Sequence, residues 1–209
     1  MSRSKKIFAM IKKGLPGVEL CRDMLVVPPT EHIVRGFLIE NTTEKGRVYL
    51  WRVVTPLHRP MRSVILDYSD RIPQTGEDIY INDTSEDSAN TIRDLIGEHL
   101  EYLQSVRRPQ DFLRHVGRMI GNSSINFRFD LALTFYRIGD LGRCRNMLRV
   151  LDEDVDKLDS EFRLPVDQLV KQAAHQIESD PSTFGRLLDR WENENIERLG
   201  LLPSRTALG

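Results

Sequence analysis

The spacing of apolar residues changes once along this chain of 209 residues, near residue 72. From Leu25 to about Ile72, apolar side chains alternate with polar ones and β-branched residues are frequent, which predicts β-strands. Beyond the segment Arg71–Asp83, which contains Pro73 and Gly76, apolar residues recur every three to four positions, which predicts helices. The sequence therefore predicts an α+β fold in which sheet and helices occupy different parts of the chain.

Three runs of strand length precede this junction: His32–Glu40, Arg47–Thr55 and Met61–Ser69. The polar segment Asn41–Gly46 joins the first two runs and has the composition of a hairpin loop. The second run is apolar on both alternations, so we expect it to be covered on both faces. With a short amphipathic helix over residues 4–13, these runs predict an N-terminal helix on a small antiparallel sheet of three or four strands.

An all-helical second half of five to seven helices is predicted after the junction. The expected organisation is a sheet subdomain over residues 1–72, a junction over 73–83, a helical subdomain over 84–200 and a flexible tail over 201–209. A chain of this length can bury enough apolar surface to fold without disulfides or metals.

The overall charge of the chain does not indicate a particular class of partner. A hydrophobic content of 40%, a charged content of 29% and a formal net charge of -1 are ordinary for a folded globular protein. Residues 1–70 contain 12 Lys and Arg against 7 Asp and Glu, and residues 71–209 contain 18 against 24. This asymmetry is too mild for a nucleic-acid-binding domain, so we expect no nucleic acid partner.

Cysteine use and hydropathy favour a cytoplasmic protein. Cys21 and Cys144 are far apart in the sequence and are expected to be reduced thiols. No run of apolar residues is long enough to span a bilayer, so no membrane span is expected.

Residues 125–151 contain two helical runs that meet at a turn formed by Gly139 and Asp140. A small residue, Cys144, followed by a large one, Leu148, would let the two helices approach closely. In this spacing the segment resembles a single tetratricopeptide unit, with Leu131, Ala132 and Phe135 at the packing positions of the first helix. Arg128, Leu151 and Asp156 depart from that pattern. Since no second copy lies 34 residues to either side, the resemblance implies one packed helix pair and not a solenoid.

The residues that could carry catalysis are few. No His-x-x-x-His pair, close cysteine pair or glycine-rich phosphate loop is present, so neither a metal nor a cofactor is predicted. The best candidates for an active site are Asp67 and Asp70 at the end of the third predicted strand, with His58 in the preceding loop. Structural ion pairs are the more common role of such charges.

No motif in the sequence identifies a function directly. The prediction is a non-enzymatic cytoplasmic protein-interaction module, such as an adaptor, an accessory factor or an immunity-type binder. The expected contact residues are Arg137, Arg143, Arg145 and Arg149 in and after the first helix of the pair. In a simpler interpretation, these arginines only neutralise the acidic run that follows them. The alternative function is a small hydrolase or metal-assisted enzyme that uses Asp67, Asp70 and His58.

Overall fold

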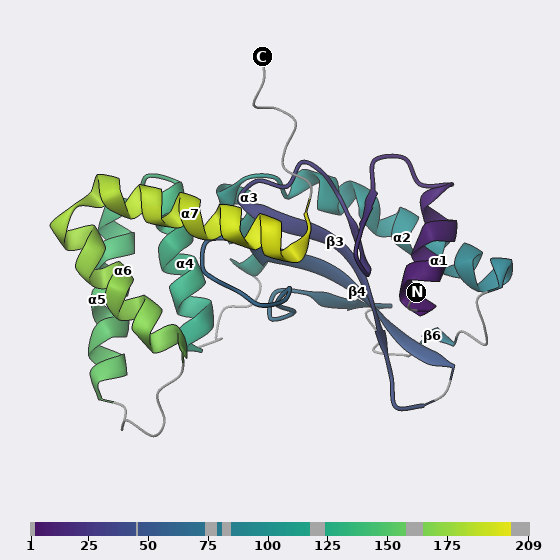
Figure 1. Cartoon of the computed structure of the whole chain (residues 1–209), viewed down its shortest axis with the longest axis horizontal. Helices are drawn as coiled ribbons and strands as arrows, with labels where there is room; N and C mark the ends of the chain where they lie inside the picture. Colours follow the sequence, from purple (N-terminus) through teal and green to yellow (C-terminus); the bar gives the residue numbers. More distant parts are fainter. Residues whose placement is uncertain are drawn as a thin grey trace, which may run out of the picture. The chain divides into compact units, whose positions relative to one another are not determined.

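The computed structural model describes residues 3–44, 46–73, 79–80, 85–117, 124–157 and 165–201. A helix, a sheet and an all-helical second half follow one another along the chain (Figure 1), which confirms the predicted α+β class. The elements are α1 (Arg3–Lys12), β1 (Glu19–Cys21), β2 (Met24–Val26), β3 (Ile33–Asn41), β4 (Arg47–Pro56), β5 (Asp70–Ile72), β6 (Ile79–Tyr80), α2 (Glu86–Ser105), α3 (Pro109–Val116), α4 (Ile125–Arg137), α5 (Leu141–Asp156), α6 (Pro165–Ser179) and α7 (Pro181–Leu199).

The sheet is antiparallel, in the order β1-β2-β3-β4-β5, and β6 also pairs with β4. Strands β3 and β4 match two predicted strands, but the third, Met61–Ser69, is wrong, because this segment is irregular and β5 begins only at Asp70. Two of its apolar residues are buried without strand pairing, Met61 and Tyr68, and the carbonyl of Ile65 accepts a hydrogen bond from Thr55 Oγ1 at 2.6 Å. Alternating hydrophobicity reports which side chains are buried and not whether the backbone pairs.

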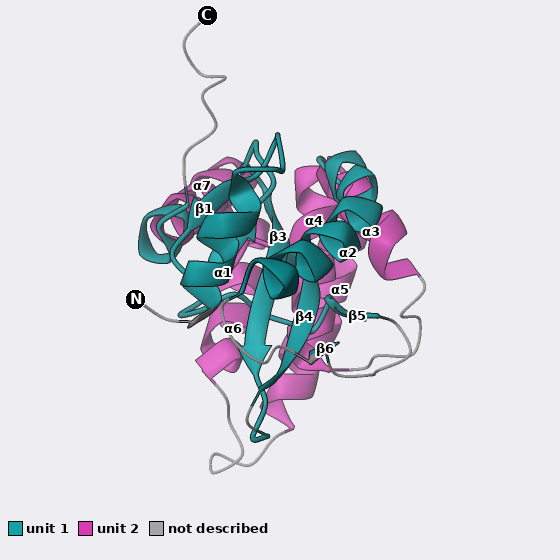
Figure 2. Ribbon diagram, turned by 90° about the vertical axis from the view of Figure 1, so that its right-hand side faces the viewer, with its two compact units in different colours: residues 1–55, 61–107, 196–209 teal, residues 56–60, 108–195 magenta. Residues whose placement is uncertain are grey.

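The chain folds as two compact units, coloured separately in Figure 2. Unit 1 consists of residues 1–55, 61–107 and 196–209, and unit 2 of residues 56–60 and 108–195. The predicted division at 73–83 differs from this one, because α2 belongs to unit 1, where it packs on α1 and β3. Most of that predicted junction, and the tail beyond Leu201, lie outside the described residues.

In unit 1, α1 and α2 pack together, α1 contacts β1 and β2, and α2 contacts β3. The apolar face of α1 is fully buried at Ile7, Phe8 and Ile11, so this helix docks on its own unit. Gly36 of β3 allows the close approach of β2, since a Cβ at this position would lie 2.0 Å from the carbonyl oxygen of Leu25.

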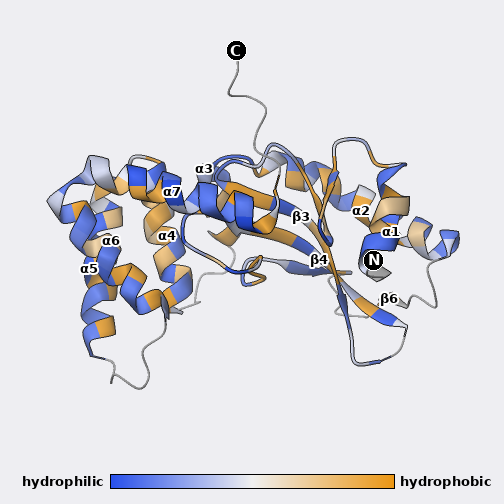
Figure 3. Ribbon diagram, viewed as in Figure 1, coloured by the Kyte–Doolittle hydropathy of each residue, from blue (hydrophilic) through white to orange (hydrophobic). Residues whose placement is uncertain are grey.

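In unit 2, helices α4 to α7 surround one apolar core, and their amphipathic colouring is visible in Figure 3. The predicted helix pair is formed by α4 and α5, which turn at Gly139 with a φ of +83°, and the Asp140 side chain caps α5 by accepting from the Arg143 amide at 3.0 Å. The core residues are Phe129, Ala132, Leu133, Cys144, Leu148, Leu151, Val155, Val166, Val170, Ala173, Ile177, Phe184, Leu187, Leu188 and Trp191.

The expected contact between these two helices is correct at Cys144 and Leu148, which are fully buried. Phe135 packs against the core while staying partly exposed, and Leu131 is not one of its members. Helix α4 contributes Ala132 and Leu133 in place of Leu131, because it is apolar on more than one face and only packing selects the buried one. Both cysteines are free and buried, and burial raises the pKa of the Cys144 thiol to about 12.

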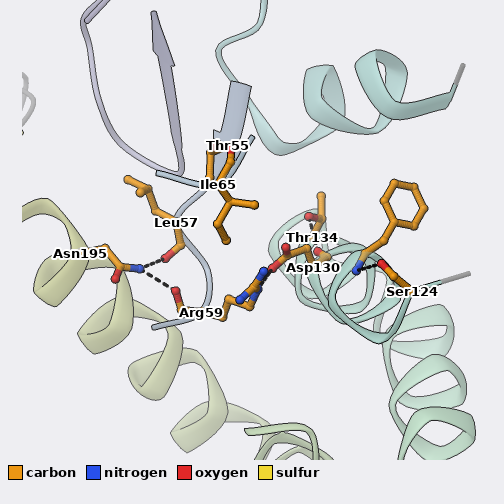
Figure 4. Close-up of polar contacts among 9 residues, drawn as sticks. Thr55, Leu57, Arg59, Ile65, Ser124, Asp130, Thr134 and Asn195 are labelled. Carbon is orange, nitrogen blue, oxygen red and sulfur yellow. Dashed lines mark hydrogen bonds and ion pairs between the residues drawn. The ribbon is translucent and has the colours of Figure 1, made fainter. Parts of the chain in front are cut away.

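A buried polar anchor holds residues 56–60 within unit 2 (Figure 4). Arg59 Nε donates to Asp130 Oδ1 of α4 at 2.8 Å, and these residues are 8% and 1% exposed. Asn195 Nδ2 donates to the carbonyls of Leu57 at 3.0 Å and of Arg59 at 2.7 Å. Two backbone carbonyls and the Arg59 side chain of the segment are therefore bonded to helices of the same unit.

Among the described residues, no helix has both the length and the apolar character needed to cross a bilayer.

We predict that Leu148→Ala lowers the free energy of unfolding by about 2 to 5 kcal/mol, because it leaves a cavity in the core of unit 2. Leu141→Ala, on the same helix, is the matched control, since Leu141 is 36% exposed. Chemical denaturation of both variants checks this. A Leu148→Ala protein as stable as the Leu141→Ala protein would show that the α4–α5 contact is not part of the core.

We also predict that Asp130→Ala destabilises unit 2 by about 3 to 5 kcal/mol, because it leaves the Arg59 guanidinium buried without its carboxylate. Asp189→Ala is the control, since the Asp189 side chain is 61% exposed in its pair with Arg137. Thermal melting compares the two. If both variants shift the melting temperature by the same small amount, the anchor makes no special contribution.

Candidate functional site

The predicted catalytic residue Asp70 is held in an ion pair within unit 1. It lies on β5 directly opposite Arg52 of β4, and Arg52 Nη2 donates to Asp70 Oδ2 at 2.6 Å. The guanidinium of Arg52 thus occupies one carboxylate oxygen of Asp70. This position therefore supports a structural role for Asp70.

Arg52 is surrounded by three partners. Besides Asp70, its Nη1 lies 3.2 Å from His99 Nδ1 of α2, and its guanidinium lies 4.5 Å from the ring centroid of Tyr102. Because a guanidinium only donates, Nδ1 of His99 accepts this hydrogen bond and the ring is neutral. Burial, and then the positive charge of Arg52, lower the pKa of His99. His99 is thus a neutral histidine of α2 that accepts a hydrogen bond from Arg52 of the sheet.

The other two catalytic candidates lie in different surroundings. Asp67 is exposed in the turn before β5 and belongs to unit 1. His58 is fully buried and belongs to unit 2. The ion pair with Arg52 therefore weighs against the enzyme interpretation at Asp70.

The four arginines predicted to bind a partner divide into three environments. Arg137 is 11% exposed in its side chain and donates to Asp189 at 2.7 Å and to Glu192 at 3.1 Å, so it holds α4 to α7. Arg143 is 71% exposed, lies 5.5 Å from the ring centroid of Phe135 and is near the start of α5. Of the four arginines, only Arg145 and Arg149 lie on the same surface.

That surface is a groove between α5 and α6 with a volume of about 450 Å³. We call it the α5–α6 groove. Its lining residues are Arg145, Leu148, Arg149, Asp152, Lys171, Ala174, His175, Ile177 and Glu178. Apolar side chains from both helices form part of the lining, and the two arginines of α5 face Lys171 and His175 of α6. The groove is therefore mixed in polarity and richer in basic than in acidic groups.

The ion pairs around the α5–α6 groove are exposed to solvent. Arg145 Nε lies 4.0 Å from Glu178 Oε1, and Arg149 pairs with Glu153 of its own helix at 2.5 Å. Lys171 pairs with Asp156. Exposed pairs of this kind contribute about 0 to 1 kcal/mol, so a ligand can displace them at small cost.

Two polar atoms of the α5–α6 groove are buried without a hydrogen bond. They are Nε of Arg145, a donor, and Oδ1 of Asp152, an acceptor, and no hydrogen-bonding group of the described chain reaches either. Leaving such an atom unsatisfied costs about 1 to 3 kcal/mol, and a ligand that supplies the missing partner recovers this energy. Arg145 and Asp152 of the groove lining thus each carry one polar atom whose hydrogen bond is not made in this structure.

Of the four arginines predicted to bind a partner, Arg145 and Arg149 line this groove, and the α6 residues of the lining were not predicted. Lys171, His175 and Glu178 follow the spacing i, i+4 and i+7, which places them on one helical face. That pattern was visible in the sequence. What it could not show is that this face of α6 lies beside the face of α5 that carries Arg145 and Arg149.

The environment of His99 predicts a pH dependence of stability. Because its pKa is lowered from 6.5 in the folded state, the unfolded chain binds the proton more tightly. The free energy of unfolding is then highest above pH 6.5 and falls as the pH drops through this value toward the folded pKa. His99→Gln stays neutral and can still accept from Arg52, so we expect it to lose less stability on acidification than the parent.

Denaturation at a series of pH values from neutral to mildly acidic checks this, with His175→Gln as control, since His175 is exposed on α6. Equal acid sensitivity of the parent and His99→Gln would contradict the assignment of a neutral, half-buried His99.

Comparison with known proteins does not assign a function to these sites. Searches against protein-family models, curated proteins and solved structures find no match for this chain.

Proposed function

We propose that the chain is a non-enzymatic, cytoplasmic protein-interaction module, of the adaptor, accessory or immunity type, and that the α5–α6 groove of unit 2 binds an acidic, extended segment of a partner protein. The observation that carries the proposal is the pair of buried, unsatisfied atoms of Arg145 and Asp152 in one groove. An extended peptide backbone carries a carbonyl acceptor and an amide donor in every residue and so matches this pair.

The size and polarity of the groove support the same ligand. Its volume of about 450 Å³ falls in the range of binding pockets, roughly 300 to 1,000 Å³. Leu148 and Ile177 offer apolar contact, which an extended segment can fill with side chains on one of its faces.

The charges at the groove favour an acidic segment. Arg145, Arg149 and Lys171 are cationic at neutral pH, against two carboxylates, Asp152 and Glu178. This excess steers acidic partners and sets the rate of association and the specificity more than the total affinity. A formal net charge of -1 for the whole chain makes a protein a better candidate partner than a nucleic acid.

The two free, buried thiols agree with a reducing compartment, which supports the cytoplasmic location in this proposal.

We test the proposal by affinity capture from a native lysate, followed by binding measurements with the purified partner. The Arg145→Ala/Arg149→Ala variant is expected to lose about tenfold or more in affinity, because it removes two charges from one wall of the groove. Arg143→Ala is the matched control. It removes an exposed arginine from the same helix but outside the groove lining.

Equal affinity of the parent and of Arg145→Ala/Arg149→Ala for the same partner would remove the groove from consideration. Equal losses in the groove variant and in Arg143→Ala would show a general effect of charge on α5 instead of a specific site. Melting temperatures of all three proteins must agree before their affinities are compared.

A further inference from the structure

We propose that unit 1 carries a second protein-binding site, formed by Tyr49, Trp51 and Arg71 on one face of the sheet, and that this site binds a segment in which a carboxylate stands beside an apolar side chain. We call these three residues the Arg71 site. It lies wholly within unit 1 and does not depend on the α5–α6 groove.

The register of β4 and β5 places two arginines on opposite faces of the sheet. Arg52 is opposite Asp70, and the next pair along the strands is Trp51 opposite Arg71. Because successive side chains alternate between faces, Tyr49 and Trp51 share the face of Arg71. On the opposite face of the sheet, Arg52 contacts His99 and Tyr102 of α2.

The surroundings of these two arginines differ. Arg52 has a carboxylate at 2.6 Å, a histidine nitrogen at 3.2 Å and an aromatic ring. Arg71 is exposed and lies over two rings, 3.7 Å from the centroid of Tyr49 and 5.0 Å from that of Trp51. No carboxylate of the described residues pairs with the guanidinium of Arg71. Its hydrogen-bond donors are therefore available to a ligand.

The rings prepare Arg71 for binding an anion. A guanidinium over an aromatic face keeps its N–H groups in its own plane, directed past the ring, where they match the two oxygens of a carboxylate. The stacking also restricts a side chain that would otherwise lose much rotamer freedom on binding. Trp51 is fixed in turn, because its Nε1 donates to Glu40 Oε2 at 2.8 Å.

The composition of the site favours a protein ligand. Trp, Tyr and Arg are the residue types most enriched at the energetic centres of protein interfaces, where apolar contact and one directed charge act together. Tyr49 and Trp51 are partly exposed, so their ring edges offer such apolar contact.

A polyanion fits this surface less well. Glu40 accepts a hydrogen bond from Trp51, and Arg47 of the same strand pairs with Glu44 at 2.9 Å, so this hairpin adds two carboxylates to the surface. Nucleic acids and anionic membranes need several cations that are not already neutralised. One available arginine beside two rings matches a single carboxylate next to an apolar group.

The test is selection of a random displayed peptide library on the immobilised full chain, followed by calorimetric titration of the synthetic peptides. We expect recovered sequences to place Asp or Glu next to an aliphatic or aromatic residue. Their dissociation constants should rise about tenfold or more in Arg71→Gln. Arg71→Lys keeps the charge but loses the planar fork, so its loss should be intermediate. Arg62→Gln, which changes another exposed arginine of unit 1, should bind like the parent.

Peptides without an acidic residue, equal binding by the parent and Arg71→Gln, or a selection that yields no common sequence would each overturn the proposal. So would a labelled single-stranded oligodeoxythymidine or phosphatidylserine vesicles that bind the parent but not Arg71→Gln, since the occupant would then be a polyanion. The same peptides should still bind Arg145→Ala/Arg149→Ala, which separates the Arg71 site from the α5–α6 groove.

Discussion

The buried ion pair between Arg59 and Asp130 is the interaction on which unit 2 most depends. Unit 2 is discontinuous in sequence, and the short segment 56–60 belongs to it although the residues on both sides belong to unit 1. Burying two charges is costly unless they meet with good geometry and further hydrogen bonds, and here the distance is 2.8 Å. Asn195 supplies two more hydrogen bonds to the carbonyls of the same segment. The segment is therefore held by specific polar contacts in addition to apolar burial.

The surroundings of each arginine distinguish those that hold elements together from those that lie in a candidate binding site. Arg52, Arg59 and Arg137 each meet a carboxylate within 2.8 Å and have side chains at most 11% exposed, so they hold elements together. Arg145 and Arg149 are more exposed and lie in a groove where the pairs are loose or local. An arginine can form fewer hydrogen bonds to a partner when carboxylates already surround it, because its guanidinium donors are then occupied.

The two proposed sites use this property in different ways. In the α5–α6 groove, Arg145 carries a donor atom and Asp152 an acceptor atom, and both lack hydrogen bonds. At the Arg71 site the rings of Tyr49 and Trp51 hold an exposed guanidinium in place. The first arrangement favours a ligand with paired donor and acceptor groups, and the second favours a single carboxylate. The sites belong to different units, so each can be tested by variants that leave the other intact.

The sequence by itself determined the fold class, the strands β3 and β4 and the helix pair turning at Gly139. These follow from local rules: hydrophobic period, turn residues and helical spacing act over a few positions. The sequence did not determine that Met61–Ser69 is irregular, that α2 packs in unit 1, that Arg137 is held by Asp189, or that Lys171 completes the groove. Only the tertiary structure decided these points, because strand pairing, helix docking and the partner of each charge depend on residues distant in sequence that packing brings together.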